Sequence, residues 1–248
     1  MFNEAASSGP LKMSIVVCEW GPAGARKFDG TAGAMVIVDV LSFSTCVDIA
    51  VARGAMVYPF PYGDFSAAAV AARAIGAEIA GPRGSTKYRY SLSPSSLCAI
   101  EAGTKLVLPS PNGAAISVAA RNVPVFTGCL RNAKAVAARA AALAQGTAVA
   151  VIPAGERWPD GSLRPSIEDL IGAGAVIEAL GLPCSPEAVI AREIFCSVRL
   201  RLGELVGGCV SGQELINQGY AHDVEVAIEL DASIAAPLLE DGAYIDIG

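Results

Sequence analysis

Acidic side chains stand at positions of this sequence where chemistry is expected. Asp39 closes an apolar run, and an Asp at the carboxyl end of a strand can hold a metal ion or act as a nucleophile. Glu156 follows another apolar run, and Glu168 and Asp169 stand in the first turn of a predicted helix. If these four carboxylates converge on one edge of a sheet, they form a site of hard oxygen ligands that suits Mg²⁺. This ion binds few carboxylates together with waters and substrate phosphate.

Each of these carboxylates also has a structural interpretation. Asp39 can cap the turn that follows it, and Glu168 and Asp169 can complement the dipole of their helix. Gly172 and Gly174, further along that helix, indicate close packing against another backbone. The residues alone leave both interpretations open.

Neighbouring loops carry groups that bind anions. Ser44 and Thr45 open a helix after Asp39, and the first amides of a helix can hold a phosphate. Asn112 and Gly113 follow a predicted strand, where glycine lets backbone amides approach a ligand, although Pro-Asn-Gly is also an ordinary turn.

Arg131 and Asn132 follow the next predicted strand. An arginine at that place suits bidentate contact with phosphate or sulfonate oxygens. A solvated arginine at the start of a helix is the equal alternative.

Other phosphate chemistries lack their motifs. A cysteine phosphatase needs C-x₅-R, and Cys46 and Arg53 are one residue too far apart. A D-x-D mechanism needs a second Asp where this chain has Leu41. No P-loop occurs and no G-x-G-x-x-G follows a strand, so nucleotide cofactors are not indicated. The single histidine, His222, lies in a polar stretch typical of a surface, so acid–base chemistry must use carboxylates, lysine or metal-bound water.

The elements that position these residues alternate along the chain. Runs of β-branched residues alternate with Ala-rich stretches of helical period, which predicts an α/β fold of βαβ units around a largely parallel sheet. Strands are predicted at 14–18, 34–40, 56–60, 77–81, 105–109, 123–128, 147–153, 224–230 and 243–247, and helices are predicted to begin near Ser44, Asp64, Gly113, Asn132, Ser166, Ser185 and Ser211. Ligands bind at the carboxyl edge of such a sheet, so we expect the site there.

Composition bounds the remaining possibilities. The 248 residues, 53% hydrophobic and 17% charged, predict one folded domain over 13–248 after a flexible segment 1–12. A net charge of −6 does not favour nucleic acid as a partner. No stretch reaches the roughly 20 apolar residues of a membrane span, and the start lacks the apolar region of a signal peptide, so we expect no membrane contact and a cytoplasmic location.

Short sequence blocks follow one another in a distinctive order along the chain: VDVLSFST (38–45), GPRG (81–84), SLSP (91–94), SPNG (110–113), GCLRNA (128–133), PAGE (153–156), EDLIGAGA (168–175) and SGQEL (211–215). Taken together, from about Ile15 to the C-terminus, they resemble the 2-phosphosulfolactate phosphatase family. The resemblance implies a three-layer α/β/α fold with internal duplication, to which the weak likeness of 49–60 and 116–128 adds support. It also implies Mg²⁺-dependent hydrolysis of a phosphate monoester on a small sulfonated three-carbon acid.

Matched residue by residue, the family's acidic and polar positions fall on Asp39, Asn112, Gly113, Asn132, Glu156, Glu168 and Asp169. The chain departs from the family pattern at Ser42 and Phe43, where the family shows Arg-Ala, at Pro82, where it shows Glu, and at 91–94. An arginine lost at position 42 removes a charge-assisted contact worth about 1.5–3 kcal/mol. Arg83, Arg131 or Arg89 can supply that charge from another loop.

The resulting hypothesis is a Mg²⁺-dependent phosphatase of a small anionic phosphomonoester. Asp39 and Glu156 are its expected catalytic residues, and both bind the metal together with Glu168 and Asp169. The residues expected to bind phosphate are Ser44, Thr45, Arg83, Asn112, Gly113, Arg131 and Asn132. The alternatives left open are a non-catalytic protein that binds small anions on the same fold, and a homodimer in place of a monomer.

Overall fold

The computed structural model describes residues 14–61 and 65–248 of the chain. The predicted flexible segment 1–12 lies outside these residues, as does Asp64. The strands are β1 (Ile15–Cys18), β2 (Ala34–Val38), β3 (Met56–Pro61), β4 (Glu78–Ile79), β5 (Lys105–Ser110), β6 (Val125–Gly128), β7 (Ala148–Pro153), β8 (Glu156–Arg157), β9 (Leu163–Arg164), β10 (Pro237–Glu240) and β11 (Ala243–Asp246).

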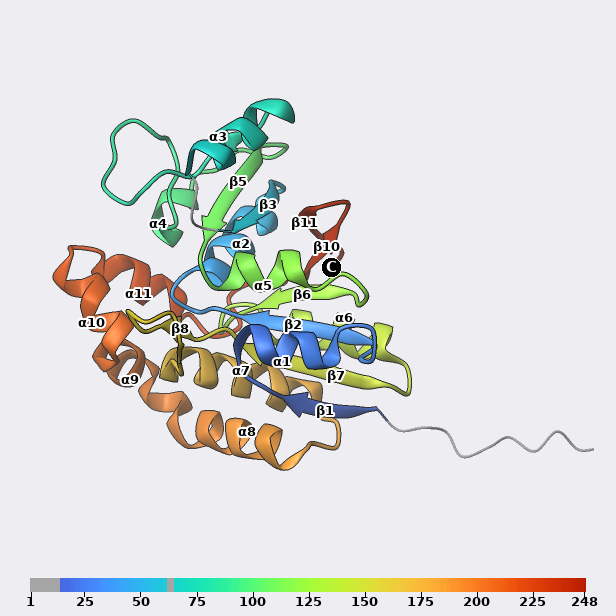
Figure 1. The fold of residues 1–248 in the computed structure, drawn as a ribbon. Coiled ribbons are helices and arrows are strands. Elements are labelled where there is room, and N and C mark those ends of the chain that lie inside the picture. The colour runs from blue at the N-terminus through green and yellow to red at the C-terminus, as the bar shows by residue number, and fades with distance from the viewer. Residues whose placement is uncertain (1–13, 62–64) are drawn as a thin grey trace, which may run out of the picture.

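The α-helices are α1 (Gly21–Phe28), α2 (Phe43–Ala52), α3 (Phe65–Ala74), α4 (Pro94–Leu97), α5 (Gly113–Ala119), α6 (Ala133–Ala144), α7 (Ile167–Leu180), α8 (Pro186–Val198), α9 (Leu202–Gly208), α10 (Val210–Asn217) and α11 (Ala221–Ala227). Figure 1 shows these helices around a central sheet.

The central sheet has nine strands in the order β1-β7-β2-β6-β10-β11-β3-β5-β4. Strands β1, β7, β2 and β6 are mutually parallel, and so are β3, β5 and β4. The hairpin β10–β11 joins the two groups through antiparallel pairs on each side. The prediction of an α/β fold with a largely parallel sheet is therefore confirmed, with the hairpin making the sheet mixed. The internal duplication stays a prediction.

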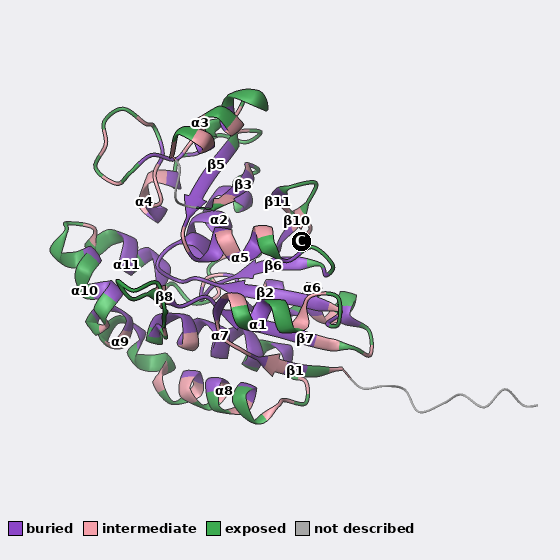
Figure 2. Cartoon of the chain, viewed as in Figure 1, coloured by how far each residue is buried: buried purple, intermediate pink, exposed green. Residues whose placement is uncertain are grey.

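Alternating side chains of the strands build a core on each face of the sheet. In β2, Val36 and Val38 cluster with α6, α7 and α8, whereas Met35 and Ile37 cluster with α1, α2, α4 and α5. A strand buried on both faces reads as a continuous apolar run, as β2 does. Figure 2 shows β2, β6 and most of α7 buried, and the outer faces of α3 and α8 exposed.

One predicted strand is wrong. The segment 224–230 was expected to be extended, but its first residues belong to α11. Val226 and Ala227 are adjacent and both buried, which a strand with one buried face does not allow. Val224 and Ala227 lie about one helical turn apart and are both buried, so the spacing of the buried residues fits a helix and not a strand. Strand β10, in contrast, was not predicted.

The close packing predicted at Gly174 is confirmed. A Cβ atom added there would lie 2.9 Å from the backbone carbonyl carbon of Ala191 in α8. Helices α7 and α8 therefore approach to backbone contact, which fixes the position of α7 against the sheet.

None of the helices in the described part of the chain combines the length and the apolar character that crossing a bilayer requires.

Candidate active site

Asp39 follows the end of β2 and is 4% exposed. Its Oδ1 accepts a hydrogen bond from the amide of Phe43 at 3.1 Å, and its Oδ2 accepts one from the amide of Gly113 at 2.9 Å. The bond to Phe43 is the turn-capping role that the sequence left open. The bond to Gly113 fastens the start of α5 to the end of β2.

Asp169 is placed by the close approach of α7 to β2. A Cβ atom at Gly172 would lie 2.6 Å from Val40 Cγ2 and 2.9 Å from Val38 Cγ1, so only glycine permits this contact. Asp169 then reaches both neighbouring loops, since Oδ1 accepts from the amide of Val40 at 2.8 Å and Oδ2 from the amide of Gly155 at 2.9 Å. It holds the loops after β2 and β7 side by side.

Glu156 begins the short hairpin β8–β9 just after β7. Its Oε2 accepts a hydrogen bond from Asn112 Nδ2 at 2.8 Å. In the hairpin register Glu156 pairs with Arg164, whose positive charge attracts the carboxylate. The predicted residues Glu156 and Asn112, which are 44 positions apart, are thus in direct contact.

Glu168 lies in the first turn of α7 and is 2% exposed. Its Oε2 accepts a hydrogen bond from the thiol of Cys209 at 3.2 Å. Burial, and then the charge of Glu168, raise the pKa of that thiol to about 12, so it remains a donor near neutral pH.

Three of the four carboxylates, Asp39, Glu156 and Asp169, have raised pKa values. Burial raises the pKa of Asp39 to about 6, and Glu168 adds to this, while the amides of Gly113 and Phe43 oppose it. Burial and the charge of Asp39 raise the pKa of Glu156 to about 7. Burial, Asp39 and Glu168 raise the pKa of Asp169 well above its ordinary value. In each case burial is the largest cause, and the charge of a neighbouring carboxylate adds to it.

Carboxylate oxygens are the donors that Mg²⁺ prefers in proteins. Among the residues described, however, no three or more His, Cys, Asp or Glu side chains are grouped so as to hold a metal ion. Asp39 and Asp169 use both oxygens on backbone amides. The arrangement fits Mg²⁺ in the common mode of one or two carboxylates completed by waters and substrate phosphate.

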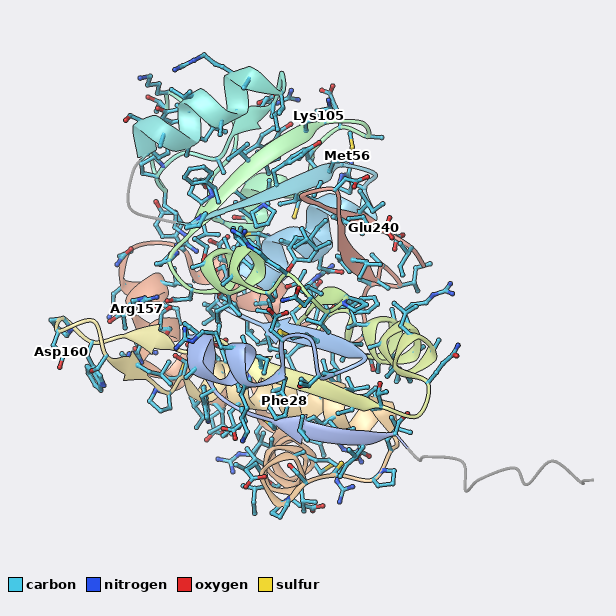
Figure 3. All side chains as sticks on the ribbon, turned by 45° about the vertical axis from the view of Figure 1, so that its right-hand side comes forward. Phe28, Met56, Lys105, Arg157, Asp160 and Glu240 are labelled. Atoms are coloured by element: carbon cyan, nitrogen blue, oxygen red, sulfur yellow. The ribbon has the colours of Figure 1, made fainter. Side chains whose placement is uncertain are left out.

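A cavity of about 370 Å³ opens beside Glu156 and Asn112. Its other walls come from α1, from α5 and from the hairpin, and they include Arg26 and Arg157. Figure 3 shows Arg157 where the hairpin leaves the body of the molecule and Asp160 toward its outer end. The cavity has the size of a small-molecule site, with carboxylate and amide on one side and two cations on the others. Sequence reasoning missed both arginines: Arg157 directly follows the PAGE block but was not assigned a role, and Arg26 lies in helix α1, which was not predicted.

The side chains of Ser44, Thr45 and Asn132 are engaged in hydrogen bonds within the protein, and Ser44 Oγ also accepts one from Thr127 Oγ1 of β6 at 2.7 Å. Ser44 Oγ accepts from the amide of Asp39 at 2.9 Å, and Thr45 Oγ1 donates to the carbonyl of Val40 at 2.7 Å. Asn132 Oδ1 accepts from the amide three residues before it at 2.8 Å. These side chains shape the loops that carry Asp39 and the start of α6.

Two of the predicted arginines are engaged by other carboxylates. Arg131 Nε donates to Asp48 at 2.9 Å, and its Nη1 contacts Glu229. Arg89 is half exposed and pairs with Glu101 at 2.7 Å. The structure does not bring either guanidinium into hydrogen-bond contact with the four carboxylates.

Arg83 does reach the site. Its Nη2 donates to Ser42 Oγ at 2.8 Å, at the start of α2, and its charge lowers the pKa of Asp39. Behind it lies Asp223, which sequence reasoning missed because the segment after it was predicted as a strand. A helical spacing of Asp223 with Val224 and Ala227 is the signal that marks it as buried.

The chain is similar in sequence to known proteins. The family model described as 2-phosphosulpholactate phosphatase matches residues 23–242. A protein of Gloeobacter violaceus named "Probable 2-phosphosulfolactate phosphatase" is 31% identical over 217 residues, which cover 84% of this chain and 89% of that protein. A protein of Carboxydothermus hydrogenoformans with the same name is 31% identical over 215 residues, covering 82% and 85% of the two chains.

Proposed function

The chain belongs to the 2-phosphosulfolactate phosphatase family, and we propose that it is a Mg²⁺-dependent phosphatase that hydrolyses a small anionic phosphomonoester. The proposed substrate is 2-phosphosulfolactate, giving sulfolactate and phosphate. One observation supports the proposal beyond the family: Asp39, Glu168 and Asp169, which are buried, and Glu156, which is partly buried, lie close enough for their charges to interact, and Glu156 lines a cavity of about 370 Å³.

In the proposed site Asp39 and Glu156 bind Mg²⁺, with Glu168 and Asp169 beside them. When bound, the ion lowers the pKa of a coordinated water and offsets negative charge that develops on the phosphoryl group. The raised pKa values of Asp39 and Glu156 support this assignment, because a divalent cation stabilises carboxylates whose mutual repulsion is otherwise unrelieved.

Glu156 is the proposed general base. Without metal, burial raises the pKa of this carboxyl group to about 7. A bound Mg²⁺ would lower that pKa and keep the group ionised, which is the form that accepts a proton. The amide of Asn112 holds one oxygen of Glu156 and leaves the side chain facing the cavity. The proton that Glu156 accepts is therefore one on a nucleophile in that cavity.

The substrate is proposed to lie in the cavity with its phosphate toward Asn112, Gly113 and the start of α2 at Ser44–Thr45. Arg26 and Arg157 on the other walls suit a second anionic group. 2-Phosphosulfolactate carries a carboxylate and a sulfonate besides its phosphate, so its charge matches such a cavity.

Phosphate release from a panel of small phosphomonoesters tests the proposal. We expect Mg²⁺-dependent turnover of 2-phosphosulfolactate, abolished by EDTA. No release above the EDTA control for any ester overturns it. Stabilisation of the protein by phosphate analogues that needs no Mg²⁺, without any turnover, favours the alternative of a non-catalytic anion-binding protein.

A further inference from the structure

Arg83 contacts three other side chains but still has free N–H donors. Its Nη2 donates to Ser42 Oγ at 2.8 Å, and its guanidinium lies 5.7 Å from the ring centre of Tyr220. Its Nε lies 3.5 Å from Asp223 Oδ2. A guanidinium has five N–H donors in a planar fork, so this one can still grip an oxyanion with two of them.

Asp223, on α11, is fully buried. Its Oδ1 is saturated by Ser93 Oγ at 2.7 Å and by the amide and hydroxyl of Ser95 at 3.1 and 2.5 Å. These serines belong to the loop and first turn of α4, which packs against α11 (Figure 1). The carboxylate is thus rigidly placed by one oxygen while the other faces Arg83.

The two facing atoms are both left without hydrogen bonds. In the described part of the chain, neither Arg83 Nε nor Asp223 Oδ2 has a hydrogen-bond partner, and both atoms are buried. Their separation of 3.5 Å exceeds the 2.7–2.9 Å of a direct charged hydrogen bond. Asp223 attracts Arg83 and sets its direction without consuming a donor.

Arg83 also lines a second cavity, of about 230 Å³. The other described residues that line it are apolar or neutral, among them Phe65, Leu92 and Gln218, so Arg83 alone is charged among them. A charge with free donors at the wall of such a cavity, beside the start of α2, suits an anion.

We propose that Arg83 binds a tetrahedral oxyanion of the substrate, a phosphoryl or a sulfonate group, and that Asp223 is the positioning residue that aims it. This inference rests on the proposed phosphatase function and deepens it. Removing the charge of Asp223 leaves Arg83 without its fixed counter-charge, so the guanidinium loses its orientation and anion affinity falls. Asp223 touches no substrate itself.

A double-mutant cycle on the full-length protein tests the inference. The variants are Arg83→Met, Asp223→Asn and the double variant, titrated by calorimetry with inorganic phosphate and with methanesulfonate in the presence of Mg²⁺. We expect Asp223→Asn to weaken binding of one of these anions about 5- to 20-fold, and the double variant to bind no worse than Arg83→Met, because residues that act through each other are not additive. The anion that is affected identifies the group that Arg83 grips.

Asp29→Asn is the control. Like Asp223, Asp29 accepts hydrogen bonds from backbone amides of a loop, in its case those of Arg121 and Asn122. We expect it to leave both affinities unchanged. If Asp223→Asn does not fold, Ser95→Ala replaces it, since it removes one donor to the same carboxylate; we then expect a 2- to 5-fold weaker affinity.

Wild-type affinity in Asp223→Asn or Ser95→Ala, additive losses in the double variant, or no binding of either anion by the unaltered protein overturns the inference. The proposed function fails separately. If the protein shows no turnover but its anion binding depends on Arg83 and Asp223, the phosphatase function is refuted. The anion-binding role of Arg83 then still stands. If the protein turns over substrate and the Asp223→Asn variant keeps normal anion affinity and KM, the phosphatase function stands and the role of Asp223 is refuted.

Discussion

The carboxylate of Asp39 accepts a hydrogen bond of 2.9 Å from the backbone amide of Gly113, across 74 positions of the sequence. Asp39 follows β2 in one parallel group of the sheet, and Gly113 follows β5 in the other. The three antiparallel pairs between these groups reverse the strand direction, yet the two loops are in hydrogen-bond contact. This bond therefore joins the two parts of the candidate site.

Gly113→Ala should weaken that junction. The new Cβ atom would overlap the ring of Phe43 and lie 2.9 Å from Asp39 Oδ2, within a fully packed region. Overpacking of this kind costs about 1–3 kcal/mol, and each kcal/mol lowers the Tm by about 2–4 °C in a chain of this size. Gly208→Ala in exposed helix is the matched control, with no atom within 4 Å of its Cβ, and it should not lower the Tm.

Asp39→Asn should reduce kcat by about 100-fold or more, since it removes a carboxylate from the proposed metal site. The protein should still fold. An Asn oxygen can satisfy only one of the two amides that Asp39 now accepts, which costs about 1–3 kcal/mol, while the loss of one charge from the repelling cluster offsets part of that cost. Asp241→Asn, in the turn between β10 and β11, makes the same change of charge and should keep kcat. Wild-type kcat in Asp39→Asn would show that this aspartate is only a cap.

Without metal, the protein should lose stability as the pH rises from about 4 to about 7. The folded-state pKa values of Asp39 and Glu156, about 6 and about 7, lie above their ordinary values of 3.8 and 4.5. The folded state therefore binds more protons than the unfolded state in this window, and stability falls with pH. In EDTA, we expect a Tm at pH 8 roughly 5 °C or more below that at pH 5.

Two comparisons check the origin of that pH effect. Glu156→Gln should flatten the profile, because it removes one of the titrating groups. Mg²⁺ should raise the Tm more at pH 8 than at pH 5. A profile that is the same in wild type and Glu156→Gln would contradict the assigned pKa of Glu156.

Arg26→Gln and Arg157→Gln should each raise KM for 2-phosphosulfolactate about 3- to 10-fold with little change in kcat. Both arginines line the cavity beside Glu156 and are exposed, so their removal weakens substrate binding and leaves the carboxylates in place. For phenyl phosphate, which has no second anionic group, KM should change less. Arg139→Gln on the exposed face of α6 alters the net charge equally and should leave KM unchanged; an equal rise there would point to a general charge effect.

Some of the site could be predicted from local sequence. Asp39 and Glu156 each follow an apolar run that could only be a buried strand, and β2 and β7 are neighbours in the sheet with parallel direction. Both carboxylates therefore emerge at the same edge, as expected. Asp223 could not be found in this way, because the alternating valines after it fit the period of a strand as well as that of a helix.

The sequence by itself determined the α/β class, most strand positions and the polar loops that end them, because hydrophobic period and turn residues act over a few neighbouring residues. The tertiary structure decided which loops meet. It brings Asn112 into a hydrogen bond with Glu156 and Arg131 into an ion pair with Asp48. It also places Arg83, and not Arg131, beside Asp39. These choices depend on strand order and on the β10–β11 hairpin between the two parallel groups. Pairing between segments far apart in the chain is set by the packing of the whole core, and no local pattern encodes it.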